Sequence, residues 1–113
     1  MKIKQSEKYN AVILEIRGNV LGGPEAQEFG DLLHKLLEEN KMNIIVDLSD
    51  VKFMNSSGLG MMISGLTTVS KAGGKFKLAG VGEKIQSLLI ITKLITIFET
   101  YDTVDLAIES LGK

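Results

Sequence analysis

The sequence has 113 residues, of which 44% are hydrophobic and 24% are charged. We expect one globular domain, residues 1–113, because this length is too short for two ordinary domains. Cysteine is absent, which excludes disulfide bonds, thiolate metal sites and cysteine nucleophiles, and the single His34 excludes most multi-histidine zinc sites. We therefore predict no metal and no cofactor.

The net charge is -1, from 13 basic and 14 acidic residues. Such a balance supplies no long-range attraction toward phosphate backbones or acidic membranes, so we expect no nucleic-acid partner. The first ten residues lack the apolar core of a signal peptide, and the longest apolar run, Leu88–Ile91, is too short to span a bilayer. We expect a cytoplasmic protein without membrane insertion.

The first half of the sequence predicts a hairpin, a helix and a buried strand. Lys2–Gln5 alternates briefly and Ala11–Arg17 alternates clearly, so we expect two strands joined by a turn around residues 7–10. The apolar period is 3.6 from about Pro24 to Asn40, which indicates a helix that covers one face of a sheet. Asn43–Leu48 is a nearly continuous, β-branched run typical of a strand buried on both faces.

The second half alternates helices with strands. Helical spacing returns at residues 57–72, with a predicted core stripe of Leu59, Met62, Ile63, Leu66 and Val69. After it we expect a strand at Lys75–Ala79, a helix at Gly82–Ile91, a short strand at Thr96–Glu99, and a last helix that Asp102 or Thr103 caps. Alternating elements imply parallel pairing through crossovers. The predicted fold class is α/β, a small mixed β-sheet flanked by helices.

The most informative segment is Asp47–Gly60, in which a buried strand leads through a polar loop into a helix. The first N–H groups of a helix lack internal partners, so a side-chain oxygen is favoured there and a phosphate even more so. From the residues alone, Asn55, Ser56 or Ser57 is either a simple cap or part of a switch.

This segment also resembles a known family. The run Asp47-Leu48-Ser49 followed by Asn55-Ser56-Ser57-Gly58-Leu59-Gly60 is similar to the signature of bacterial anti-sigma factor antagonists, which are STAS-domain proteins. The similarity extends over nearly the whole chain, including Ala72-Gly73-Gly74-Lys75 and the late Lys93-Leu94. It implies a STAS-like fold.

The resemblance also implies a function and its partners. In that family the second serine of the pair, which matches Ser57, is phosphorylated by an anti-sigma factor that is a serine kinase with an ATPase fold. A PP2C-type phosphatase removes the phosphate. Asn55 stands where the family usually has an aspartate, and residues 19–23 lack the acidic residue often found in that loop. Both differences remove negative charge from the edge that would face the kinase.

A second face of the helix at residues 57–72 is small and weakly polar. A rotation of 100° per residue places Gly60, Met61, Ser64, Gly65 and Thr68 opposite the predicted core stripe. An exposed Met61 with small neighbours suits a docking surface, although an isolated exposed methionine also needs no explanation. The predicted partner-binding residues are Asn55, Ser56, Ser57, Gly60, Met61, Ser64 and Thr68, with Gly22 and Gly23 from the earlier loop.

Enzymatic function is the weakest hypothesis. The glycines at 58, 60 and 65 fit neither a dinucleotide fingerprint nor a P-loop, and His34 lies on the polar side of its helix without a nucleophile nearby. We predict no catalytic residues. Two hypotheses remain: an anti-sigma factor antagonist that phosphorylation of Ser57 switches off, freeing a sigma factor when unmodified, and a constitutive STAS adaptor or scaffold in which Ser57 is only a cap.

Overall fold

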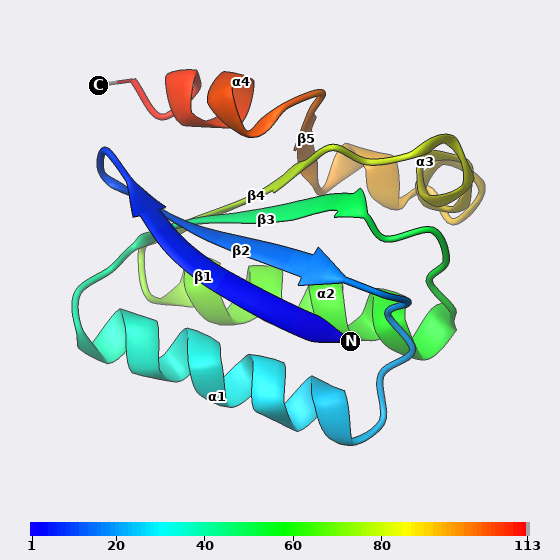
Figure 1. Cartoon of the computed structure of the whole chain (residues 1–113), viewed down its shortest axis with the longest axis horizontal. Coiled ribbons are helices and arrows are strands. Elements are labelled where there is room, and N and C mark those ends of the chain that lie inside the picture. Colours follow the sequence, from blue (N-terminus) through cyan, green and yellow to red (C-terminus); the bar gives the residue numbers. More distant parts are fainter. Residues whose placement is uncertain (113) are drawn as a thin grey trace.

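A computed structural model describes residues 1–112, which form a five-stranded mixed sheet flanked by helices (Figure 1). The strands follow one another in the order β1-β2-β3-β4-β5, and β1 is the antiparallel member. The elements are β1 (Lys2–Lys8), β2 (Ala11–Arg17), α1 (Pro24–Glu38), β3 (Asn43–Asp50), α2 (Ser56–Lys71), β4 (Lys75–Ala79), α3 (Glu83–Ile91), a 3-10 turn (Leu94–Thr96), β5 (Glu99–Tyr101) and α4 (Val104–Glu109). The predicted fold class is confirmed.

Helices cover both faces of the sheet. Helices α1 and α2 lie side by side beneath it, and α4 lies on the opposite face (Figure 1). Alternate residues of β2 therefore enter different cores: Leu14 packs with α1 and α2, whereas Ile13 packs against Ala107 and Ile108 of α4. Strand β3 is buried on both faces, as its β-branched run predicts.

The bounds of three strands, β1, β3 and β5, differ from the prediction, and β3 continues to Asp50 instead of ending at Leu48. Strand β1 continues to Lys8, so the hairpin turn contains only Tyr9 and Asn10. The last strand is Glu99–Tyr101 rather than Thr96–Glu99, because residues 94–96 form a 3-10 turn and Phe98 is buried in the main core. The short pattern misplaced the strand because Ile97 and Phe98 look equally apolar, yet Ile97 is exposed.

The predicted exposure of Met61 is wrong. Met61 is 4% exposed and Gly65 is buried, because α1 covers this side of α2. A Cβ added at Gly65 would lie 3.0 Å from a ring carbon of Phe29 and 3.1 Å from a methyl carbon of Leu33. Helix α2 thus has two buried sides, one against the sheet and one against α1, and its buried stripe is rotated toward α1. The 3.6-residue period of α2 alone does not show that α1 packs against it.

Candidate functional site

The loops that follow β2 and β3 are joined at the carboxyl ends of these two parallel strands. The backbone N–H of Val20 donates to the carbonyl of Phe53 at 3.1 Å, and the N–H of Asn55 donates to the carbonyl of Val20 at 3.3 Å. Val20 also forms an isolated parallel bridge with Met54. The two predicted site segments, residues 22–23 and 55–57, are therefore held next to each other.

Asn55 is the cap of α2. Its side-chain oxygen accepts a hydrogen bond from the N–H of Gly58 at 2.7 Å, and its backbone is extended, as a cap residue requires. Gly58 lies so close to the first loop that an added Cβ would be 2.0 Å from the carbonyl oxygen of Val20. The amide of Asn55 and the missing side chain of Gly58 together fix the start of α2 against Val20.

Ser57 lies in the first turn of α2, with its side chain exposed. Gly22 packs behind it: a Cβ added at Gly22 would lie 2.7 Å from the Cβ of Ser57, and Gly22 has a φ of 80°, which favours glycine. The first turn of α2 contains no acidic residue. The hydroxyl of Ser57 therefore sits beside the positive end of the helix dipole, and no carboxylate of that turn offsets it.

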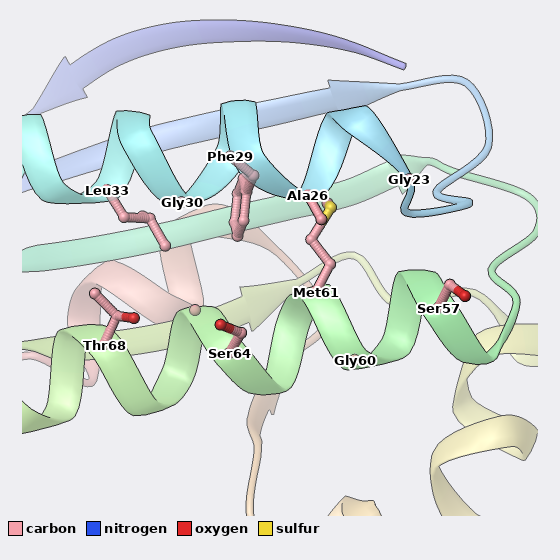
Figure 2. Close-up of a pocket in the computed structure, with 11 residues that line it drawn as sticks. Gly23, Ala26, Phe29, Gly30, Leu33, Ser57, Gly60, Met61, Ser64 and Thr68 are labelled. Carbon is pink, nitrogen blue, oxygen red and sulfur yellow. The ribbon is translucent and has the colours of Figure 1, made fainter.

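From Ser57 a groove of about 310 Å³ runs between α1 and α2. Figure 2 shows Phe29 and Leu33 pointing down from α1 and Met61 reaching up toward Ala26. Gly30 and Gly60 border open space in the groove, because a Cβ at either position would meet no atom within 4 Å. None of the residues that line it is charged: Gly23, Ala26, Phe29, Gly30, Leu33, Ser57, Gly60, Met61, Ser64, Gly65 and Thr68.

The structure brings most of the predicted site residues to one edge of the molecule. Ser56, Ser57, Gly60, Ser64 and Gly23 are exposed there, Asn55 and Thr68 are half-buried, and Gly22 is buried. Met61 contributes to the wall of the groove rather than to an exposed surface. The sequence analysis missed the α1 wall. Its signal was available, since Ala26 and Gly30 are small residues four apart in a helix of larger ones.

The remaining candidates lie elsewhere. His34 is exposed and faces a different cavity, between the carboxyl ends of α1 and α2. The side chain of Asp47 accepts from the N–H of Ser49 at 3.0 Å, and both residues belong to β3. Among residues 1–112, no group of three or more His, Asp and Glu side chains could hold a metal ion. Within the same residues, no helix has the length and apolar content needed to cross a membrane.

Residues 2–107, which include both site loops and the groove, match the STAS domain family. The chain belongs to the bacterial STAS-domain family of anti-sigma factor antagonists. The anti-sigma-B factor antagonist of Bacillus subtilis is 30% identical over 112 residues, which cover 97% of this chain and 92% of that protein. A Thermotoga maritima protein provisionally named an anti-sigma factor antagonist is 34% identical over 79 residues, 70% of each chain.

Solved structures agree with the family and with the fold. The crystal structure of a Thermotoga maritima protein, again provisionally named an anti-sigma factor antagonist, has a TM-score of 0.88 and 28% identity, covering 98% of this chain and 95% of that one. The anti-sigma factor antagonist SpoIIAA in its unphosphorylated form has a TM-score of 0.72 at 14% identity, covering 97% of each chain, and therefore supports the fold alone. SpoIIAA of Bacillus has also been solved in a phosphorylated form.

Proposed function

We propose that this STAS domain is a cytoplasmic anti-sigma factor antagonist that phosphorylation of Ser57 switches off. The unmodified protein binds an anti-sigma factor through Ser56, Ser57 and the exposed rim of the groove, and so frees a sigma factor for transcription. The names of the relatives support the antagonist role. The protein itself performs no chemistry in this proposal, and the anti-sigma factor supplies the kinase.

The position of Ser57 is the observation that supports the switch most strongly. Its exposed hydroxyl stands at the end of an uncharged groove and beside the N–H groups of the first turn of α2. Asn55, rather than Ser57, makes the capping hydrogen bond. Because the cap role is already filled, the hydroxyl of Ser57 remains available to accept a phosphate.

A phosphate on Ser57 would change binding more than folding. The dianion would meet the positive end of α2, where negative charge is favoured, so the domain keeps its structure. Binding at the groove rim would instead remove water from a charge of about -2 on a surface that otherwise has no charge, and this desolvation opposes association. The switch therefore needs no rearrangement of the domain.

The resemblance supplies the types of partner. It implies that the anti-sigma factor is a serine kinase with an ATPase fold and that a PP2C-type phosphatase reverses its action. SpoIIAA, which shares the fold, exists in phosphorylated and unphosphorylated forms. Asn55 lacks the carboxylate usual in the family, but its amide still forms the cap, so the helix that presents Ser57 is intact.

Capture followed by calorimetry tests the proposal. The unmodified protein is used as bait in its native cytosol, and the recovered ATPase-fold protein is then purified. We expect Ser64→Arg and Ser57→Asp each to weaken binding by at least about tenfold, or about 1.4 kcal/mol, whereas Ser57→Ala binds like the parent. Ser64 is exposed, so the Arg variant folds normally.

The charged variants and the neutral Ser57→Ala variant separate the two hypotheses. If Ser57→Asp binds as tightly as the parent while Ser64→Arg does not bind, the groove is a docking surface without a switch, and the constitutive adaptor hypothesis replaces this one. If other STAS proteins are recovered in place of an ATPase, the adaptor hypothesis is also favoured. Full binding by both variants would place the docking surface elsewhere.

A further inference from the structure

We propose that an apolar strip formed by Leu21, Phe53, Leu88 and Ile91 is a second part of the docking surface and anchors an apolar side chain of the anti-sigma factor. This inference rests on the proposed function, because it assigns the strip to the same partner. The strip lies outside the groove between α1 and α2, and none of its four residues lines that groove.

The bridge between the two loops explains why the strip is exposed. Val20 and Met54 pair with each other, and both side chains are buried. Since side chains alternate along an extended segment, the neighbours Leu21 and Phe53 point outward. They are 46% and 52% exposed. Phe53 is the exception among the four phenylalanines, because the other three are buried in the core.

Helix α3 extends the strip. Phe53 lines a small, mostly apolar pocket of about 190 Å³ together with Leu88 and Lys84 of α3. Ile91 follows Leu88 by three residues, on the same side of the helix, and is 78% exposed. An apolar patch that combines an aromatic ring, an aliphatic helix stripe and a pocket is typical of an interface anchor.

Continuity with the groove rim indicates which partner covers the strip. Leu21 directly precedes Gly22, which packs against Ser57, so one end of the strip adjoins the proposed phosphorylation site. A protein that binds over Ser57 and extends toward α3 would cover both surfaces at once.

The charges beside the strip indicate which residues of the partner would flank the apolar side chain that it binds. Lys84 lines the same pocket as Phe53, and Lys52 and Lys84 both line the adjacent cavity, where Glu83 is the one carboxylate. The local excess of positive charge favours a partner segment in which an apolar side chain is flanked by carboxylates. We therefore expect Lys84→Glu to slow association with the anti-sigma factor, and the effect to diminish at high salt.

Two exposed positions give the direct test, with a third as the matched control. Phe53→Ser and Ile91→Ser are each expected to weaken binding of the captured anti-sigma factor by at least about tenfold. In a phosphorylation assay they are expected to raise the KM for this protein as substrate and to leave kcat unchanged, because they do not alter Ser57. Leu106→Ser on α4 is the control, since Leu106 is also 46% exposed and α4 lies across the sheet from α1 and α2.

The same variants distinguish failure of this inference from failure of the proposed function. If Phe53→Ser and Ile91→Ser bind like the parent while Ser64→Arg does not bind, the strip is not part of the interface, although the proposed function stands. If all three bind like the parent, the proposed function fails as well. If Phe53→Ser abolishes self-association in sedimentation experiments and leaves partner binding unchanged, the strip joins two copies of this chain, and the inference is overturned.

Discussion

Asn55 and Gly58 fix the position of the start of α2. The side chain of Asn55 satisfies the N–H of Gly58, and the absence of a side chain at Gly58 lets the helix approach the carbonyl of Val20. Both residues act on the backbone near Ser57, and neither adds charge to the groove rim. Unfolding measurements on variants at these positions therefore test the local structure without the partner.

Asn55→Ala is expected to lower the free energy of unfolding by about 1 kcal/mol, because one N–H of the first turn loses its acceptor. Asn55→Asp is expected to be at least as stable as the parent at neutral pH, since a carboxylate also caps and is favoured by about 0.3–1 kcal/mol at a helix N-terminus. Urea unfolding measures both. Equal stability of the parent and the Ala variant would show that the hydrogen bond to Gly58 contributes nothing.

The glycines of α2 provide a matched pair of Ala substitutions. Gly58→Ala is expected to destabilise the protein by about 2 kcal/mol or more, because the new Cβ would lie 2.0 Å from a carbonyl oxygen. Gly60→Ala meets no atom within 4 Å and is expected to stabilise it by about 0.5–1 kcal/mol through helix propensity. Thermal unfolding compares the two variants, and destabilisation of similar size in both would contradict the close contact with Val20.

Among the elements, the packing of α1 against α2 determines which residues of α2 are exposed to a partner. Helix α2 has one side against the sheet and another against α1, so its exposed residues, which include Ser57, Gly60 and Ser64 at the groove rim, lie on the side that remains. Met61 is buried between the two helices, so its side chain is not exposed to a partner.

Met61→Ala is therefore expected to lower the free energy of unfolding by about 2–3 kcal/mol, whereas Ser64→Ala changes it by less than about 0.5 kcal/mol. Met61 is 4% exposed and Ser64 is exposed, so the two variants differ in the cavity that they create. Guanidinium unfolding provides the comparison. A stable Met61→Ala variant would mean that α1 does not cover this side of α2.

A buried lysine joins β4 to β5. The ammonium of Lys77 donates to the Glu99 carboxylate at 3.0 Å and to the Tyr101 hydroxyl at 3.3 Å. Burial lowers the pKa of Lys77, but its hydrogen bonds to Glu99 and Tyr101 outweigh this effect and raise that pKa above 10.5. The hydrogen bond from Lys77 lowers the pKa of the Glu99 carboxyl below 4.5, against the opposing effect of burial.

The lowered pKa of Glu99 predicts a pH dependence for this pair. Its stabilisation is fully present above about pH 4.5 and is lost as the pH falls through the lower pKa of the folded state. Glu99→Gln is thus expected to be less stable than the parent at neutral pH, with the difference shrinking in acid. Denaturant unfolding across this range measures the difference, with exposed Glu109→Gln as the control. A difference that grows below pH 4.5 would contradict the assignment.

At the scale of the whole molecule, the sequence predicted the type of each helix and strand better than the packing between them. The β-branched run of β3 and the 3.6 period of α1 and α2 were sufficient for the element types, because each depends on local spacing. The second buried side of α2 was not predictable from that period, since it depends on where α1 packs. The short β5 was misplaced because three residues give too little pattern to distinguish exposed Ile97 from buried Phe98.

The candidate site shows the same limit. The Ser56-Ser57 pair and the glycines at 22 and 23 stood out in the sequence, but the bonds from Val20 to Phe53 and from Asn55 to Val20 that join their loops did not. The exposed strip of Leu21 and Phe53 depends on these long-range bonds, which is why an apolar residue in a loop gave no signal by itself.

The central claim is that Ser57 is the phosphoacceptor that controls binding. The most direct measurement is phosphopeptide mapping after the parent protein is incubated with the captured anti-sigma factor and ATP, followed by calorimetry on the phosphorylated product. We expect one phosphate, on Ser57, in the parent and in Ser56→Ala, none in Ser57→Ala, and binding of the phosphorylated protein weakened by at least about tenfold. Continued labelling of Ser57→Ala, or tight binding by the phosphorylated protein, would contradict the account.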